Sequence, residues 1–253
     1  MGYWIQETEG VLLKLTVARS GVVWGINHSG DRTDSMYRRM QGQGGWKLMP
    51  PLPDQRPDNY ISTLTAAADG TVLITDLNRH IYRWNESSQL WYVFPNSSMH
   101  TMYAGSARHI WAIGFDGLPY EYLQDEVFAD RSAGVGTVKS IAVGGDGTVC
   151  VIDSNATIQR YIGEGTYHPI QGVNNCLILR VNSANDIYVM DEENKIYKYA
   201  GDRVWNEIPL TDQKGNPLPG AGIRDFDFAS DGTGFVLLGL PDSNQPNIYR
   251  FIP

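Results

Sequence analysis

The sequence predicts an all-β fold, a six-bladed β-propeller with four-stranded antiparallel blades. A short aromatic and basic strand signature recurs six times, roughly 40 residues apart. Each copy follows two apolar segments that are separated by a turn, and no segment has sustained helical periodicity. A unit of this length cannot bury its own apolar faces, so neighbouring units are expected to pack around a ring.

The recurring signature marks the third strand of each blade. Its copies are Tyr37-Arg38-Arg39, Ile81-Tyr82-Arg83-Trp84, Tyr120-Glu121-Tyr122, Ile158-Gln159-Arg160-Tyr161, Ile196-Tyr197-Lys198-Tyr199 and Ile248-Tyr249-Arg250-Phe251. The turn between the first and second strands precedes each copy, at Gly21, Gly70, Arg108, Gly147, Asn185 and Gly232. Asp-Gly pairs at three of these turns favour two-residue hairpins, because glycine accepts a positive φ.

Aromatic residues begin the outer strands, but only five outer strands follow a third strand: Trp46, Trp91, Phe128, Tyr167 and Trp205. The last third strand ends at Pro253, whereas Trp4-Ile5-Gln6 precedes the first repeat without a partner. We expect this N-terminal strand to complete the last blade, which closes the ring and removes both exposed edges. The predicted single domain contains repeats 11–50, 51–95, 96–131, 132–170, 171–210, and 211–253 plus 1–10.

Composition and charge limit the classes of function. The 253 residues carry a formal net charge of −8 and no basic run, which argues against binding to nucleic acid. The sequence contains no 18-residue apolar run, so it predicts no membrane span. It also contains no basic region followed by an apolar stretch, so it shows no secretory signal. We therefore expect a cytoplasmic protein, with non-conventional release left open. Cys150 and Cys176 are expected to be buried free thiols.

The first repeat resembles a tectonin repeat. The resemblance lies in three segments: Trp4 to Val17, Gly21-Val22-Val23-Trp24-Gly25-Ile26-Asn27, and Met36-Tyr37-Arg38-Arg39. It is partial in the second and fifth repeats, and Glu121 replaces the basic residue in the third. The resemblance implies a multivalent β-propeller lectin that functions in defence, with glycan sites at or between blades. It also implies recognition of O-methylated sugars, as in some fungal members of the family.

The aromatic and basic positions are the candidate ligand-binding residues. A sugar site needs a flat aromatic face for the apolar side of a pyranose and a few fixed donors and acceptors for its hydroxyls. Outer-strand tryptophans and third-strand basic residues satisfy this need, and the second blade, with its additional Trp84, is the strongest single candidate. The full set is Trp4, Arg38, Trp46, Arg83, Trp84, Trp91, Arg160, Lys198, Trp205 and Arg250.

Packing is the alternative interpretation of the same residues. Tryptophans and tyrosines in a propeller often pack blade against blade, and arginines stack on their rings or pair with acids. A propeller that serves as a platform for protein interaction is therefore the second hypothesis for function. Glycans or glycoconjugates are the expected partners under the first hypothesis, and homo-oligomers are compatible with both.

Four longer segments interrupt the repeats: Asn27 to Ser35, Pro50 to Asn59, Thr211 to Gly222, and Gly239 to Asn247. If strands alternate in direction within each blade, all four lie on one face of the ring, over blades six, one and two. Loops inserted on a rigid scaffold are common locations for function. This decorated face is accordingly a candidate interaction surface.

Catalysis and metal binding receive little support from the sequence. Asp225 and Asp227 alternate on a predicted innermost strand, but one strand does not supply a nucleophile, an acid and an orienting group. The five histidines are scattered and show no metal-ligand spacing. The turns at Asp76, Asp153 and Asp191 suggest calcium only weakly, because Asp and Asn bind their own backbone in hairpin turns. We expect a non-enzyme without a cofactor or a metal.

Overall fold

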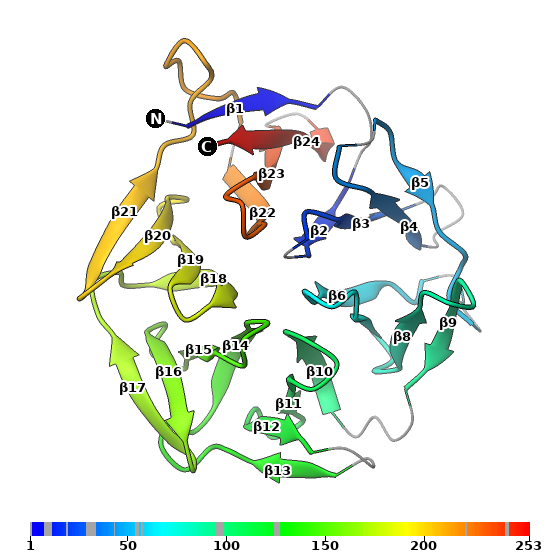
Figure 1. The fold of residues 1–253 in the computed structure, drawn as a ribbon, viewed down its shortest axis with the longest axis vertical. Coiled ribbons are helices and arrows are strands. Elements are labelled where there is room, and N and C mark those ends of the chain that lie inside the picture. Colours follow the sequence, from blue (N-terminus) through cyan, green and yellow to red (C-terminus); the bar gives the residue numbers. More distant parts are fainter. Residues whose placement is uncertain are drawn as a thin grey trace.

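The protein forms a six-bladed β-propeller in a computed structural model (Figure 1). The structure describes residues 2–7, 12–18, 20–28, 34–42, 44–53, 56, 58–94, 99–123, 127–220, 222–240 and 243–253. Each of the six sheets has four antiparallel strands, as the sequence predicts. No helix long and apolar enough to cross a membrane is found in these ranges.

The blades follow one another around the ring in chain order (Figure 1). Blades 1 and 2 contain β2 (Lys14–Val17), β3 (Val23–His28), β4 (Asp34–Arg39), β5 (Lys47–Leu48), β6 (Ile61–Ala66), β7 (Val72–Asp76), β8 (Ile81–Asn85) and β9 (Leu90–Val93). Blades 3 and 4 contain β10 (Met99–Ala104), β11 (Ile110–Gly114), β12 (Pro119–Tyr122), β13 (Phe128–Asp130), β14 (Val138–Val143), β15 (Val149–Asp153), β16 (Ile158–Gly163) and β17 (Thr166–Ile170). Blades 5 and 6 contain β18 (Cys176–Ser183), β19 (Asp186–Asp191), β20 (Ile196–Gly201), β21 (Val204–Ile208), β22 (Gly222–Phe228), β23 (Gly234–Leu240), β24 (Ser243–Ile252) and β1 (Tyr3–Gln6).

The N-terminal strand closes the ring. β1 pairs antiparallel with β24, with Trp4 opposite Phe251, so Trp4 belongs to blade 6 and the prediction is confirmed (Figure 1). The Trp4 ring is 1% exposed, and its indole Nε1 donates to the Pro209 carbonyl at 3.1 Å. Both ends of the sequence therefore contribute strands to one sheet.

The three Asp-Gly turns between first and second strands, at Gly70, Gly147 and Gly232, differ from the expected two-residue hairpins. In blade 2 the Ala67 N–H donates to the Thr71 carbonyl, and the Gly70 N–H donates back to the Ala67 carbonyl. This pattern encloses three loop residues, with Gly70 last at a φ of 86°. Glycine is still required, because a side chain is strained at this φ. The extra loop residue allows the Asp69 carboxylate to accept the Thr71 N–H at 3.0 Å.

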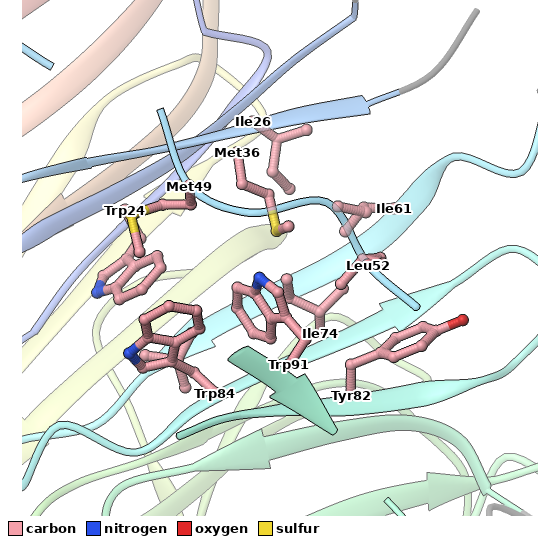
Figure 2. Close-up of a cluster of buried hydrophobic side chains, with 11 residues drawn as sticks. Trp24, Ile26, Met36, Met49, Leu52, Ile61, Ile74, Tyr82, Trp84 and Trp91 are labelled. Carbon is pink, nitrogen blue, oxygen red and sulfur yellow. The ribbon is translucent and has the colours of Figure 1, made fainter. Parts of the chain in front are cut away.

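The core lies between neighbouring blades. Figure 2 shows the cluster between blades 1 and 2, where Trp24 packs against Trp84 and Trp91 with ring centroids 5.6 and 5.8 Å apart. Equivalent clusters fill the other five grooves, so each blade buries both of its faces. Cys150 and Cys176 lie in the cluster between blades 4 and 5 as buried free thiols, as expected.

The longer segments take two forms. The connections β5 to β6 and β21 to β22 are loops, and the second contains an isolated bridge between Thr211 and Pro217. The expected loop from Gly239 to Asn247 is wrong, because β23 and β24 continue through it with Leu238 paired to Asn247 and Leu240 to Ser243. Extended ladder hydrogen bonding replaces a loop there. Residues 29–33 of the Asn27 to Ser35 segment lie outside the described residues, between the paired His28 and Asp34.

Candidate functional site

The third-strand basic position lies at the same place in every blade. Each residue at this position is paired with a second-strand residue whose side chain packs toward the following blade, as Trp24 does in blade 1 and Leu73 in blade 2. The six residues are Arg38, Arg83, Glu121, Arg160, Lys198 and Arg250. They face the six grooves between blades, one in each groove.

In the groove between blades 1 and 2, the basic residue is engaged by an acid. The Arg38 guanidinium donates to both carboxylate oxygens of Glu86, at 2.7 and 3.1 Å, and its carbon lies 5.5 Å from the Trp24 ring centre. The hydrogen bond from Arg38 is the main cause of a lowered pKa at Glu86, and the Trp84 indole adds a donor at 2.7 Å. The Arg38 guanidinium is therefore already engaged within the protein.

Four of the other five equivalent residues also have a partner within the chain. Arg160 donates to the Ala184 carbonyl at 3.4 Å, and Lys198 forms an ion pair with Asp186 at 2.9 Å. Arg250 lies 2.9 Å from a Glu7 carboxylate oxygen, and Glu121 accepts from Arg131 at 2.9 Å. These side chains therefore contribute to the connection of strands or blades.

Arg83 is the exception. Within the described ranges, its guanidinium has no hydrogen bond, ion pair or aromatic partner, although the side chain is half-buried. It lines a pocket of about 440 Å³ at the outer part of blade 2, and all the residues that line this pocket belong to that blade. This volume is in the range of small-ligand sites. The cation is thus available to a ligand.

Tyr92 supplies the aromatic face of this pocket. It lies directly opposite Arg83 in the β8–β9 ladder, so both side chains project from the same face of the sheet. Tyr92 is 49% exposed, and its hydroxyl donates to Ser88 Oγ at 3.1 Å. An exposed ring beside an unengaged guanidinium provides both stacking and hydrogen-bond donation.

Two carboxylates border the pocket, together with Asn85. Burial opposes ionisation of Asp69, but the backbone N–H groups of Ala107 and Thr71 donate to it, and together these contacts lower its pKa. Glu86 is held ionised by Arg38. At neutral pH the pocket therefore holds one cation without a partner among the described residues and two carboxylates that already accept hydrogen bonds, which suits a neutral polyhydroxyl ligand more than a charged one.

The rings of the two predicted tryptophans of blade 2 are buried in the core on the other side of the sheet from Arg83. Trp84 is paired with Trp91, and both project from the opposite face of the sheet into the core between blades 1 and 2 (Figure 2). Each is 3% exposed, and the Trp91 indole donates to the Pro50 carbonyl at 3.1 Å. Adjacent residues in a strand alternate between faces, so the Arg83 side chain and the Trp84 ring lie on opposite sides of the sheet, although Trp84 also borders the pocket.

The remaining predicted tryptophans also pack within the protein. Trp4 is buried against Phe228 and Phe251. Trp46 is half-buried beneath the Arg39 guanidinium, 6.0 Å from the ring centre. Trp205 is half-buried, lies 5.0 Å from the Tyr199 ring and donates to the Gln171 carbonyl at 3.0 Å. None of these three rings lies beside the third-strand basic residue of its own blade.

Sequence reasoning missed Tyr92, although a signal for it was present. The search for aromatic residues centred on tryptophans at the start of each outer strand. Strict alternation across an antiparallel ladder would instead have identified the residue paired with Arg83, and Tyr92 follows Trp91 directly.

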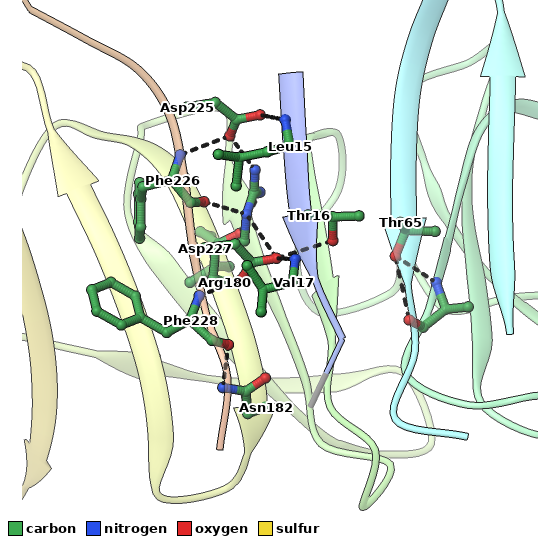
Figure 3. A network of polar contacts seen from close by, with 12 residues as sticks. Leu15, Thr16, Val17, Thr65, Arg180, Asn182, Asp225, Phe226, Asp227 and Phe228 are labelled. Atoms are coloured by element: carbon green, nitrogen blue, oxygen red, sulfur yellow. Dashed lines mark hydrogen bonds and ion pairs between the residues drawn. The ribbon is translucent and has the colours of Figure 1, made fainter. Parts of the chain in front are cut away.

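The inner-strand carboxylates considered for catalysis have structural partners (Figure 3). Asp225 accepts from the Leu15 N–H at 3.0 Å and from Arg180 at 2.5 Å. Asp227 accepts from the Thr16 hydroxyl at 3.0 Å and the Val17 N–H at 2.8 Å. Together they connect blade 6 to blades 1 and 5.

The Asp-containing turns considered for calcium use their carboxylates for their own backbone. Asp153 Oδ1 accepts from the Asn155 and Thr157 N–H groups, and Asp191 Oδ1 accepts from Glu193 and Lys195. Among the described residues, no group of three or more His, Cys, Asp or Glu side chains could hold a metal ion.

The sequence matches no protein-family model and no curated protein. The structure is similar to YCF48 bound to D1 peptide, with a TM-score of 0.61 and 13% identity over 100% of this chain and 97% of that chain. A putative gluconolactonase aligns with a TM-score of 0.63 and 12% identity over 99% and 91% of the two chains. The WD40 β-propeller domain of Doa1 aligns with a TM-score of 0.59 and 13% identity over 97% and 95%. At these identities the likeness shows the fold alone, which is a β-propeller.

Proposed function

We propose that this protein is a non-catalytic lectin that binds a neutral glycan in the groove between blades 2 and 3. The observation that carries the proposal is the unengaged Arg83 guanidinium, because the equivalent residues of the other five blades each have a partner in the chain. A half-buried cation without a partner loses hydration and gains no protein contact in return. A ligand that accepts hydrogen bonds from the guanidinium compensates for the lost hydration.

The chemistry of the pocket favours a sugar. Tyr92 offers a ring face for the apolar side of a pyranose, and Arg83 and Asn85 offer donors for its oxygens. Leu90 projects on the same side of β9 as Tyr92 and is 51% exposed, so an O-methyl group would have an apolar contact. The resemblance to tectonin repeats, which implies glycan sites at or between blades, supports the same class of ligand.

A glycan array that includes O-methylated mannose and fucose tests the proposal with the full-length wild-type chain, Arg83→Ala and Tyr92→Ala. Wild-type binding should be inhibited by free sugar. Each variant should lose at least tenfold in affinity, because each removes a principal contact of the site. Thermal melting should change little, since neither side chain is in the core.

Matched controls separate this site from general surface effects. Phe115→Ala removes a 65% exposed aromatic ring elsewhere, and Lys214→Ala removes an exposed cation, and both should retain binding. Trp91→Ala should lower the melting temperature through lost packing. Absence of sugar binding by folded wild-type protein would overturn the lectin proposal, and equal binding by Arg83→Ala would move the site to another groove.

A further inference from the structure

The central channel opens into a second cavity, on the face opposite the turns that border Arg83 and Tyr92. Its volume is about 580 Å³, and residues of all six inner strands line it, most of them in the first half of their strand and Tyr103 near the end of β10. Because strands alternate in direction, this mouth lies on the same face as the β5–β6 and β21–β22 connections. The cavity is independent of the proposed sugar site in both position and lining.

The charges at this mouth are unbalanced. Arg224 is exposed, and within the described ranges its guanidinium has no hydrogen bond or ion pair. The Lys14 ammonium donates to the neutral Ser62 carbonyl at 2.7 Å, and no acid among the residues described pairs with it. Both side chains line the cavity, and a concave low-dielectric surface concentrates their positive potential. This occurs on a chain whose formal net charge is −8.

The acidic residue in the cavity wall does not neutralise these two cations. Asp225 is 8% exposed, and its carboxylate accepts from Arg180, from the Leu15 N–H and from its neighbouring Phe226 N–H (Figure 3). Arg180 in turn is paired with Asp225 and also donates to the Phe226 and Leu179 carbonyls. Among the described residues that line the cavity, Lys14 and Arg224 therefore remain as the two cations without an acid.

Apolar side chains share the same cavity. Leu177 lies at the rim and is 55% exposed, and the partly exposed Leu13, Leu64 and Ile178 also line the walls. Exposed leucine beside unpaired cations favours a ligand that has both an anionic group and an apolar body. A purely inorganic anion would leave the apolar wall in water.

We propose that the channel mouth binds a small organic carboxylate with an apolar body. Its carboxylate accepts charge-assisted hydrogen bonds from Lys14 and Arg224, and its apolar part lies against Leu177 and the neighbouring aliphatic wall. The site takes an anion, whereas the groove between blades 2 and 3 takes a neutral sugar. Failure of either proposal leaves the other standing.

Isothermal titration of the full chain at low salt with hexanoate, acetate and hexan-1-ol tests this site. Hexanoate should bind saturably and lose affinity as salt is added, because screening weakens exposed charge pairs. Acetate lacks the apolar body and hexan-1-ol lacks the charge, so each should bind at least tenfold more weakly. Lys14→Gln and Arg224→Gln should each weaken hexanoate binding about tenfold or more.

Lys214→Gln is the control, because it removes an exposed cation on the same face outside the cavity and should leave hexanoate binding unchanged. Thermal melts confirm that each variant is folded. The proposal is overturned by absence of hexanoate binding in folded wild-type protein, by equal affinity for hexanoate and hexan-1-ol, or by full affinity in a folded Lys14→Gln/Arg224→Gln double variant.

Discussion

Asp227 shows how a single residue is used for connection rather than chemistry. Its carboxylate is buried at the channel wall and accepts from Thr16, Val17 and Phe228, with Arg180 3.8 Å away (Figure 3). Burial disfavours the ionised form and outweighs these donors, so the pKa of Asp227 rises to about 6. The folded state therefore holds a proton on this group more strongly than the unfolded chain does.

This shift predicts the pH dependence of stability. The folded pKa is raised, so between the ordinary value of 3.8 and about 6 the native state binds more protons than the unfolded state. The Asp227 contribution to the free energy of unfolding should then fall as pH rises through this window. Relative to Asp227→Asn, the wild type should gain on the order of 1–3 kcal/mol between pH 7 and pH 4.

Urea denaturation of both proteins at pH 4.5, 6 and 8 measures this difference, and groups that titrate equally in the two proteins cancel. A wild-type advantage that grows with rising pH would contradict the prediction. It would mean that Arg180 and the N–H donors favour the ionised carboxylate more than burial disfavours it.

At the scale of elements, β1 and the residue that follows it act as the closure of the ring. Trp4 packs into the cluster between blades 5 and 6, where Phe228 and Phe251 surround its ring. After the strand, the Glu7 carboxylate lies 2.8 Å from Arg39 of blade 1 and 2.9 Å from Arg250 of blade 6. The N-terminal segment therefore packs between blades 5 and 6 through Trp4 and connects the last blade to the first through the ion pairs of Glu7.

Trp4→Ala tests how much β1 contributes to the free energy of unfolding. Removing a fully buried tryptophan should lower the free energy of unfolding by about 3–5 kcal/mol, because the cavity is lined by side chains held from both blades. Ile5→Ala is the matched control in the same strand, since Ile5 is 40% exposed, and it should cost less than about 1 kcal/mol. Urea denaturation compares the two, and an equally small loss in both would show that β1 contributes little to stability.

Prediction from the sequence succeeded where local pattern decides an element. Strand number, blade order and the positive-φ glycines follow from spacing and residue type, as Gly70 and the pairing of Trp4 illustrate. The segment Gly239 to Asn247 was predicted wrongly, because its Pro and Asn residues favour a loop while strand pairing with β23 provides the hydrogen bonds. The sequence identifies candidate site residues by their type, but it does not predict which side chains of other blades they contact.

The whole molecule has two distinct faces and six grooves that are similar in backbone but different in contacts. In five grooves the third-strand residue has a partner supplied by the chain, and in the groove between blades 2 and 3 it has none among the residues described. The six-fold repeat of the sequence therefore does not imply six equal sites. On the proposed function, the chain carries one sugar site.

Titration calorimetry with the monosaccharide that best inhibits array binding should give a stoichiometry of about one sugar per chain. The reason is that a ligand in any other groove must first displace an existing contact, such as the bidentate Arg38–Glu86 pair. A stoichiometry near six would contradict this and restore a multivalent lectin. Glu86→Gln should then be compared with wild type, since it weakens that pair.

The propeller, its six four-stranded blades and the strand that closes the ring can all be predicted from the sequence. These features depend on periodicity, turn chemistry and the burial of apolar faces, all of which are local or repeated along the chain. Only the tertiary structure decided which grooves are filled. Arg38 is paired because Glu86, 48 residues further along the chain, accepts hydrogen bonds from its guanidinium, whereas no described residue forms an equivalent pair with Arg83. Pairing between blades depends on side chains far apart in sequence, and no local pattern encodes it.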